Sequence, residues 1–350
     1  MAYSSIVKPS DYFNTKLYTG TGSSNAITGV GFQPDFTWIK KRSGAENHAL
    51  FDAVRGVTKM ITPNENYAES TVAASLTSFD SDGFTLGNVA RSNASGGSLV
   101  SWNWKAGGGQ GSSNTDGSIN TTYTSASTTS GFSIIKYPGT GSSATIGHGL
   151  GATPKVCFFK QLDGTESWRV WHRDAPNYST KATALNLNSA EFDQTGWVGT
   201  VNNSTIQLGS DGSINLNAKN YICYAFAEKT GFSKFGLYSG NGNANGTFVY
   251  TGFKPAFVMI KYVAPTGGVG DWNMYDSKRL GYNGGDAPLF ADLNNAESTD
   301  YGRIDFLSNG FKLRTTNSQL NELGSGSTYI YMAFAEAPLV GSNNVPATAR

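Results

Sequence analysis

A short run of apolar residues occurs three times in the chain, each time between a proline and a lysine. The runs are GFQPDFTWIK, LGATPKVCFFK and GFKPAFVMIK, which cover residues 31–40, 150–160 and 252–261. Between the proline and the lysine, apolar side chains occupy both parities of the sequence. A run this short, rich in aromatic and β-branched residues, predicts a strand that is buried on both faces. Proline is tolerated at the first residue of a strand, so we expect a central strand that the chain uses three times.

A second recurring pattern alternates large and small side chains, and it closes each copy. It covers residues 99–104, 221–228 and 329–336, where one parity carries large groups such as Trp102 and Phe226 and the other mainly small groups. Such alternation predicts a strand whose two faces differ. We expect the large face to fill the core of a two-sheet sandwich. The small face would then permit close approach of another layer, such as the next copy.

A tyrosine followed by a Gly-x-Gly turn lies upstream of each apolar run. The three copies of this signal cover residues 18–22, 137–141 and 238–242. Glycine readily supplies the positive φ that many tight turns need. Each tyrosine strand is therefore expected to lead into a hairpin.

A clear hairpin signal follows further along the first and third copies. Asp-Gly and Asn-Gly stand between apolar flanks at residues 79–86 and 306–313, and both dipeptides favour the type I′ turn of a two-residue hairpin. The second copy departs from this pattern, and we expect residues 207–214 to do the same job. The third copy contains extra residues, which we place in a turn at 265–270.

Together these patterns predict an all-β protein made of three tandem antiparallel β-sandwich repeats. A content of 43 glycines and only 15% charged residues favours short strands and turns over helices. The connection between the first two repeats is expected to be a Gly/Ser/Thr linker, with one short strand near residues 119–123. The predicted boundaries are an N-terminal arm (1–12), repeat 1 (13–107), the linker (108–130), repeat 2 (131–229), repeat 3 (230–338) and a C-terminal arm (339–350).

Charge and hydropathy narrow the possible partners. The net charge of +1 gives no electrostatic reason to expect nucleic-acid binding. No apolar run approaches the ~20 residues of a membrane-spanning helix. The first residues lack the apolar core of an export signal, so we expect the chain to stay in a cytoplasm until assembly or lysis. In that compartment Cys157 and Cys223 are expected to be small buried thiols and not a disulfide.

Charged residues recur at the end of a predicted strand. Asp52 and Arg55 in the first copy have the same spacing as Asp276 and Arg279 in the third, and His172 takes the place of the aspartate in the second. We interpret each aspartate–arginine pair as an ion pair within its copy, with contact to a sugar as the alternative. A side chain that changes type between equivalent positions favours a structural role for His172 over a catalytic one.

The remaining candidates for chemistry each have a structural interpretation. The other histidines lack the spacing of a zinc site, and no helix follows the Gly-x-Gly turns as in a phosphate loop. Residues 80–83, Asp-Ser-Asp-Gly, predict a turn; the alternative, a calcium loop, lacks its closing glutamate. The tryptophans either belong to sandwich cores or stack on sugar rings. These histidines and tryptophans are His48, His148, Trp168, Trp171, Trp197 and Trp272. No catalytic, cofactor-binding or metal-binding residue is assigned, and the ligand-binding residues are unknown.

The motifs taken together resemble a known family. They include KPSDYFNTKLYTGTG, GFQPDFTWIKKRSG, SFDSDGFTLG, SWNWKAGG, FVYTGFKPAFVMIK and YIYMAFAEAPLV. From about residue 8 to residue 350 the chain resembles the tandem-repeat structural proteins of marine tailed phages, including those that infect cyanobacteria and Pelagibacter-type bacteria. The resemblance implies jelly-roll, concanavalin A-like sandwiches and a virion structural or tail-fibre protein of unassigned function. It transfers no catalytic residue and no binding site.

We therefore expect a non-enzymatic virion protein, made in the cytoplasm of the host bacterium. The leading expectation is a tail-fibre or host-contact adhesin that binds a cell-surface glycan or protein, and the alternative is a head decoration or appendage protein. A polysaccharide-degrading enzyme on a concanavalin A-like fold is the alternative from another class. No acid pair is kept across the three copies, as glycoside hydrolysis would require.

The expected partners are other virion proteins, further copies of the chain and a host surface glycan. Linked weak sites act at high effective concentration, which favours a cyclic homo-oligomer, with a trimer preferred. No cofactor, nucleic acid or membrane insertion is expected. Residues 1–10 and 338–350 are poor in apolar residues, and at least one of these arms is expected to become ordered only through another subunit or virion protein.

Overall fold

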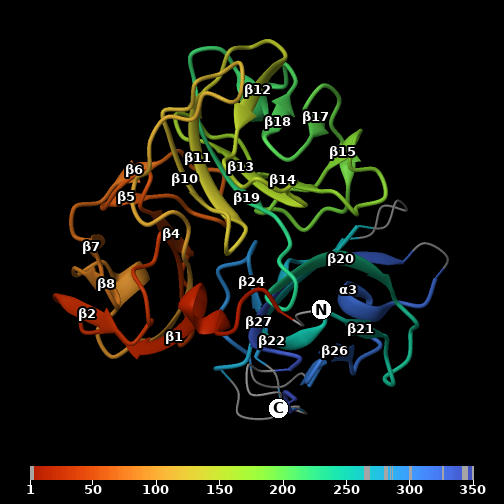
Figure 1. The fold of residues 1–350 in the computed structure, drawn as a ribbon. Helices are drawn as coiled ribbons and strands as arrows, with labels where there is room; N and C mark the ends of the chain where they lie inside the picture. The colour runs from red at the N-terminus through yellow and green to blue at the C-terminus, as the bar shows by residue number, and fades with distance from the viewer. Residues whose placement is uncertain are drawn as a thin grey trace.

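The computed structural model shows an all-β molecule of three lobes arranged around a common centre (Figure 1). Lobe 1 contains the strands β1 to β9, lobe 2 the strands β10 to β19 and lobe 3 the strands β20 to β27. All named strand pairs are antiparallel. The structure describes residues 4–263, 269–279, 283, 285, 287–298, 302–324, 327–340 and 346–348.

Lobe 1 contains a four-stranded sheet and a three-stranded sheet. The larger sheet has the order β1 (Phe13–Thr19), β9 (Ser98–Trp104), β3 (Phe36–Lys41) and β4 (Ala49–Asp52). The smaller sheet has the order β2 (Asn25–Thr28), β8 (Gly83–Leu86) and β7 (Leu76–Asp80). The lobe also has the strand pair β5 (Lys59–Met60) and β6 (Ser70–Thr71), the short helix α1 (Ala90–Asn93) and, before it in the chain, the 3-10 helix η1 (Pro9–Asp11).

Lobe 2 has the same order of strands with one strand added at an edge. Its larger sheet contains β10 (Tyr123–Ser127), β11 (Phe132–Pro138), β19 (Asn220–Phe226), β13 (Val156–Gln161) and β14 (Arg169–His172). The smaller sheet contains β12 (Ala144–Gly147), β18 (Thr205–Leu208) and β17 (Val198–Val201). The remaining elements are the pair β15 (Lys181–Ala182) and β16 (Phe192–Asp193) and the helix α2 (Gly212–Asn215).

Lobe 3 again has a larger and a smaller sheet. The larger sheet contains β20 (Ser233–Ser239), β27 (Thr328–Pro338), β22 (Phe253–Tyr262), β23 (Asn273–Asp276) and β24 (Leu289–Phe290). The smaller sheet contains β21 (Phe248–Tyr250), β26 (Gly310–Leu313) and β25 (Ile304–Leu307), and the helix is α3 (Ser318–Asn321). The turn expected at 265–270 lies largely outside the described residues.

The three apolar runs form the central strands that the sequence predicts. β3, β13 and β22 each lie between two neighbours in a larger sheet, and almost all their residues are buried. Pro34 and Pro154 stand two residues before their strands, whereas Pro255 lies within β22 at a shift of register against β27. The two-faced burial follows from the sandwich on one side and the neighbouring lobes on the other.

The alternating strands have their faces the other way round from our expectation. The large side chains of β9, β19 and β27, such as Trp102 and Phe226, belong to one cluster that draws on all three lobes. The small side chains Cys223 and Ala225 instead lie in the core within lobe 2, among apolar side chains of both its sheets such as Ile206. The reason is volume: the gap between two packed sheets is only about 10 Å, and in lobe 2 large side chains such as Tyr137 and Phe159 of the flanking strands and Ile206 of the smaller sheet already fill it. The space where three sheets converge needs large groups.

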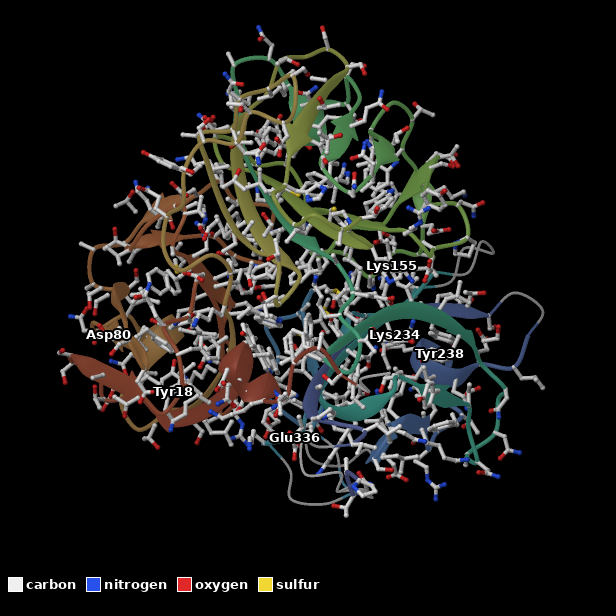
Figure 2. All side chains as sticks on the ribbon, viewed as in Figure 1. Tyr18, Asp80, Lys155, Lys234, Tyr238 and Glu336 are labelled. Carbon is white, nitrogen blue, oxygen red and sulfur yellow. The ribbon has the colours of Figure 1, made fainter. Side chains whose placement is uncertain are left out.

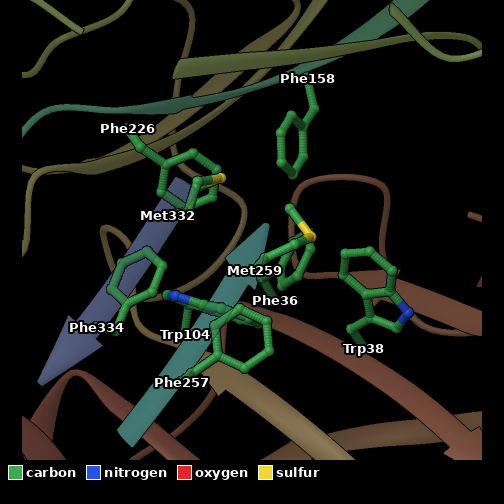
Figure 3. Close-up of a pocket in the computed structure, with 9 residues that line it drawn as sticks. All are labelled: Phe36, Trp38, Trp104, Phe158, Phe226, Phe257, Met259, Met332 and Phe334. Atoms are coloured by element: carbon green, nitrogen blue, oxygen red, sulfur yellow. The ribbon is translucent and has the colours of Figure 1, made fainter. Parts of the chain in front are cut away.

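The shared centre of the molecule is filled by aromatic and methionine side chains (Figure 3). The rings of Trp104 and Phe257 meet edge to face with their centroids 5.7 Å apart, and those of Phe226 and Phe334 lie 5.9 Å apart. The cavity left between these residues has a volume of about 10 Å³. That space is at the lower limit for a single water molecule, so the centre is a packed core and not a ligand site.

The Gly-x-Gly turns do not form hairpins, which corrects our expectation. β1 and β2 follow one another in the chain but belong to different sheets, and the same is true of β11 with β12 and of β20 with β21. In lobe 2 the turn is held by Asn215, whose Oδ1 accepts a hydrogen bond from the amide of Thr140 (2.8 Å) and whose Nδ2 donates to the carbonyls of Ser142 and Gly209 (both 2.7 Å). A side chain at Gly139 would collide with the carbonyl of Leu216 at 2.2 Å.

The hairpin predictions are confirmed in two lobes and wrong in one. β7 pairs with β8 and β25 pairs with β26, and the residues between the strands are 81–82 and 308–309, so that Gly83 and Gly310 are the first paired residues of the second strand. In lobe 2 the β17–β18 turn lies at residues 202–204 and not within 207–214. Residues 209–211 instead lead into α2, where the amide and the hydroxyl group of Ser213 both donate to the carboxylate of Asp211.

The predicted linker is tied to both lobes that it connects. Asp35 of lobe 1 accepts hydrogen bonds from the amides of Ala106, Gly108 and Gly109 at 2.6–2.9 Å. β10 then pairs with β11 along five residues, so the strand expected near 119–123 lies a few residues later. The glycines of this segment therefore allow close backbone contacts and do not make it a flexible linker.

The N-terminal arm packs against its own chain, which corrects the expectation for residues 4–12. Ile6 is buried in the shared core, and the amide of Ser5 donates to the carbonyl of Thr230. In the C-terminal arm, Val340 and Pro346 form an isolated antiparallel bridge, while residues 341–345 and 349–350 lie outside the described part of the chain.

Candidate functional site

The polar side chains that the sequence marks for chemistry gather where the lobes meet. At the boundary of lobes 1 and 2, the carboxylate of Asp52 accepts hydrogen bonds from the amide of Arg55 (2.8 Å), from its guanidinium and from the hydroxyl of Tyr224 (2.6 Å). The Asp52 and Arg55 side chains have no exposed surface. Burial alone lowers the pKa of Arg55, but the Asp52 charge more than offsets this effect and raises it. The predicted ion pair is confirmed, and burial leaves it no surface for contact with a sugar.

The boundary of lobes 3 and 1 repeats this arrangement. The guanidinium of Arg279 pairs with Asp276, whose Oδ2 also accepts a hydrogen bond from the indole Nε1 of Trp102 of lobe 1 at 2.9 Å. Glu297 accepts from Arg279 at 3.2 Å and from Arg42 of lobe 1 at 2.6 Å. Two arginines and two carboxylates therefore bind lobe 3 to lobe 1.

The boundary of lobes 2 and 3 uses a neutral version of the contact. Met332 of β27 stands at the place of the tyrosine and tryptophan donors, so no side-chain donor is available there. His172, which takes the place of the two aspartates, instead has its Nε2 3.3 Å from the carbonyl oxygen of Tyr331. Burial lowers the pKa of His172 to about 4, so the ring is neutral at pH 7. His172 thus has the same structural place as the two aspartates, and the three contacts close a ring of lobes.

A second set of side chains, four positions earlier in each lobe, also crosses the boundaries. Trp168 Nε1 donates to the carbonyl of Thr62 in lobe 1 at 3.1 Å, and Trp272 Nε1 donates to the carbonyl of Ala184 in lobe 2 at 2.8 Å. In lobe 1 the ring is that of His48, whose Nε2 lies 3.0 Å from a carbonyl oxygen of lobe 3. Burial lowers the pKa of His48 to about 3. These rings are buried structural ties and not platforms for sugars.

Three lysines at the ends of the central strands were not singled out from the sequence as functional. Lys40, Lys160 and Lys261 are fully buried, and each ammonium group donates to backbone carbonyls. Lys40 reaches the carbonyl of Asn294 in lobe 3, and Lys261 reaches that of Leu187 in lobe 2. Burial lowers the pKa of each lysine to about 8. Their recurrence six residues after a proline is the signal that could have identified them.

The amides of His48, Trp168 and Trp272 each donate to a side chain, and in lobe 3 that side chain is a carboxyl group and not an asparagine amide. Asn64 and Asn186 accept hydrogen bonds from the amides of His48 and Trp168, and in lobe 3 the corresponding acceptor is Asp292. Burial raises the pKa of Asp292 to about 7. Its Oδ2 is buried without a hydrogen-bond partner. In its protonated form the Asp292 carboxyl has one donor and one acceptor, as the asparagine amides of the other two lobes do.

The remaining candidates are also structural. Asp82 accepts hydrogen bonds from the amides of Gly29 and Gly31, as a turn carboxylate does. Cys157 and Cys223 are buried free thiols, as predicted. Within the described ranges, no three His, Cys, Asp or Glu side chains lie close enough together to hold a metal ion. No helix in the part of the chain that is described has the length and apolar character to cross a membrane.

A further ionic contact joins lobes 2 and 3, and two of its residues, Lys155 and Lys234, are labelled in Figure 2. Lys155 of lobe 2 lies 3.3 Å from Glu228, and Lys234 of lobe 3 lies 3.5 Å from the same carboxylate. These side chains are partly exposed, so the contact contributes little to stability, typically below about 1 kcal/mol. This ionic contact lies at the boundary of lobes 2 and 3 but does not account for their arrangement.

In a comparison with protein families, a single family model covers all three lobes. The model of a family described as a domain of unknown function, DUF7483, matches residues 8–338. The matched range runs from just before η1 to the end of β27 and so includes all three lobes. No curated protein and no solved structure matches the chain.

Proposed function

Because the chain belongs to the DUF7483 family, whose description assigns no function, we propose its function from its fold, its contacts and the motifs of its sequence. The proposal is a non-enzymatic structural protein of a phage virion. The motifs that resemble marine phage structural proteins support the virion assignment. The observation that carries the non-enzymatic part is that the recurring polar residues at the strand ends form buried bonds between lobes.

The unit of this structure is proposed to be a β-sandwich of the jelly-roll, concanavalin A-like kind, present in three tandem copies. The support is the strand order: in every lobe the last strand lies between the strand that precedes the Gly-x-Gly turn, which is β1, β11 or β20, and the apolar central strand. The smaller sheet likewise has the order second strand, second hairpin strand, first hairpin strand in all three lobes. The predicted repeat boundaries remain part of this proposal.

Within the virion, the proposed place is a tail fibre or another host-contact element, with a glycan or protein of the host envelope as its target. A body whose three lobes share one core is suited to holding loops and sheet faces in fixed positions, since rigid scaffolds position binding residues. The second candidate is a head decoration protein, for which the same rigidity would serve.

Other virion proteins are the proposed partners, together with further copies of the chain. Self-association would use outer surfaces, because the small-residue faces are enclosed within the lobes. Residues 4–12 also pack on the chain itself. The small-residue faces and residues 4–12 therefore offer no surface for a trimer, while residues 341–345 and 349–350 of the C-terminal arm lie outside the described part of the chain.

Immunogold labelling of intact particles tests this proposal. Antibody against the chain is applied to purified particles of the phage that encodes it. Label at the tail supports the host-contact role, and label over the head supports the decoration role. Particles that carry no label, while the chain is detected in the infected cell, would contradict a virion protein.

A further inference from the structure

The outer face of the smaller sheet differs in lobe 3 from the other two lobes. On β21, Val249 points into the core, and Phe248 and Tyr250 on either side of it are 43% and 57% exposed. On β2 of lobe 1 the two corresponding outward residues are Ala26 and Thr28. In lobe 2 the corresponding residues are Thr145 and Gly147 of β12, and they lie against Ser118 and Asn114 of the connecting segment. Lobe 1 therefore serves as the internal control, and the fold does not require aromatic rings at these positions.

Charged side chains lie beside the two rings on the same face. Phe248 is opposite Lys312 of β26, and Lys312 is opposite Asp305 of β25. Opposite residues of an antiparallel pair share a face and lie about 5 Å apart. Arg314 reaches Asp305 at 3.3 Å. Arg314 thus pairs with the carboxylate, and the second cation, Lys312, leaves these three side chains with a net positive charge.

The face is also open and hollowed at one end. A depression of about 460 Å³ is lined in part by Ala244, Asp305 and Arg314. Opposite Tyr250 the sheet has Gly310, where a side chain would collide with the carbonyl oxygen of Val249 at 2.1 Å and approach the Phe248 ring at 3.2 Å. Glycine therefore keeps the surface beside the rings low.

The size of the apolar surface indicates a small ligand. Each aromatic side chain has an area of about 150–250 Å², so the exposed parts of Phe248 and Tyr250 amount to roughly 200 Å². A stable protein interface buries about 800 Å² on each partner. Two rings with polar neighbours are suited instead to the apolar face of one or two sugar rings, whose hydroxyl groups would bond to Asp305 and Arg314.

We propose that this face, formed by Phe248, Tyr250 and Lys312 on β21 and β26, binds an acidic glycan. The rings stack on the sugar and Lys312 pairs with its carboxylate. Charge complementarity selects the acidic class over a neutral one, because among the described residues of this face Asp305 is paired with Arg314 and Lys312 has no ion pair. This inference rests on the proposed function, since a host-contact protein needs a surface that recognises a bacterial envelope.

The test is isothermal titration of the full chain with hexagalacturonate as the acidic probe and cellohexaose as the neutral probe. Wild type is expected to bind the acidic probe at least tenfold more tightly than the neutral one. A double variant with the lobe 1 residues, Phe248→Ala with Tyr250→Thr, should weaken binding at least tenfold. Lys312→Gln, which introduces the residue type that lobe 2 has on β18, should remove the preference for the acidic probe. Tyr67→Thr, at a tyrosine that is 48% exposed in lobe 1, is the matched control and should bind as wild type.

The inference would be overturned if wild type bound neither probe. It would also be overturned if the double variant bound the acidic probe as tightly as wild type. An unchanged preference in Lys312→Gln would overturn the acidic class. A concentration-dependent dimer that the double variant abolishes would show that the face binds protein instead. If the glycan titration fails but the particles carry gold label, the virion role stands without the glycan site. If the particles carry no label, the virion role is contradicted whether or not the chain binds a glycan.

Discussion

Lys160 shows what burial does to a single side chain in this molecule. Its ammonium group donates to the carbonyls of Gln161 and Gly164, and burial lowers its pKa from 10.5 to about 8. Between these values the unfolded chain holds a proton that the folded chain releases, so the free energy of unfolding rises with pH. Relative to a Lys160→Met variant, wild type should gain up to about 1.4 kcal/mol per pH unit between about pH 8 and 10.

Urea unfolding at several pH values across this window measures the difference. The comparison between two chains cancels the titration of tyrosines and cysteines, which both chains share. Lys278→Met, at an exposed lysine, should follow wild type. Parallel curves for wild type and Lys160→Met would contradict the burial of a titrating ammonium group.

Tyr224 is a second residue whose role can be isolated. Its hydroxyl donates to Asp52 across the boundary of lobes 1 and 2, and Tyr224→Phe leaves that buried carboxylate with one donor fewer. The expected loss in the free energy of unfolding is about 1–3 kcal/mol. Denaturant unfolding measures it, with the exposed Tyr67→Phe as control; a loss within a few tenths of a kcal/mol would mean that the bond does not hold the lobes.

At the scale of elements, one asparagine, Asn215, holds the turn that links the two sheets of lobe 2. Asn215→Ala removes the side chain that bonds the turn after β11 on both sides. Each buried group left unpaired costs about 1–3 kcal/mol, so the variant should lose several kcal/mol. Hydrogen exchange should quicken first in the turn between β11 and β12. The neighbouring Asn217→Ala, at an exposed position, should change neither quantity, and equal exchange in both variants would contradict the role of Asn215.

The elements themselves could largely be predicted from local sequence. The apolar runs and the Asp-Gly and Asn-Gly turns are short-range signals, and β3, β13, β22 and the β7–β8 and β25–β26 hairpins follow from them. The Gly-x-Gly turns were misinterpreted because a glycine reports a turn without reporting which sheet the next strand joins. The hairpin of lobe 2 was misplaced because Asp211-Gly212 begins a helix, where the aspartate caps the first amides.

The facing of the strands could not be predicted from alternation alone. A period of two assigns residues to two faces, but it does not say which face meets the larger volume. Trp102 and Cys223 illustrate the ambiguity, since the large group lies between lobes and the small one within a lobe. The choice depends on how three lobes are arranged, which is a property of the whole chain.

At the scale of the whole molecule, the candidate residues make sense only through distant partners. Asp52 was predicted to pair with Arg55, three positions away, and it does. Its second partner, Tyr224, is 172 positions away, and Trp102 and Asp276 are 174 apart. Separations of this size leave no local pattern in one sequence. The ion pairs were therefore predictable, and their function of joining lobes was not.

Trp104 is the residue that best reports the shared core. Its ring packs against Phe13 and Phe36 of lobe 1 and against Phe257 and Phe334 of lobe 3. Trp104→Ala should cost about 3–5 kcal/mol and should lower the unfolding temperature of all three lobes together. Hydrogen exchange of β13 in lobe 2 is the informative readout. Full protection there in the variant, with loss confined to lobe 1, would show that the lobes unfold separately.

The central claim is that three lobes with one core and a closed ring of polar contacts form a single cooperative unit. Differential scanning calorimetry of the full chain tests this most directly. The account predicts one unfolding transition whose calorimetric enthalpy equals its van't Hoff enthalpy, which is the sign of two-state unfolding. Two or three resolved transitions, or a calorimetric enthalpy about three times the van't Hoff value, would contradict it and would describe three independent sandwiches on one chain.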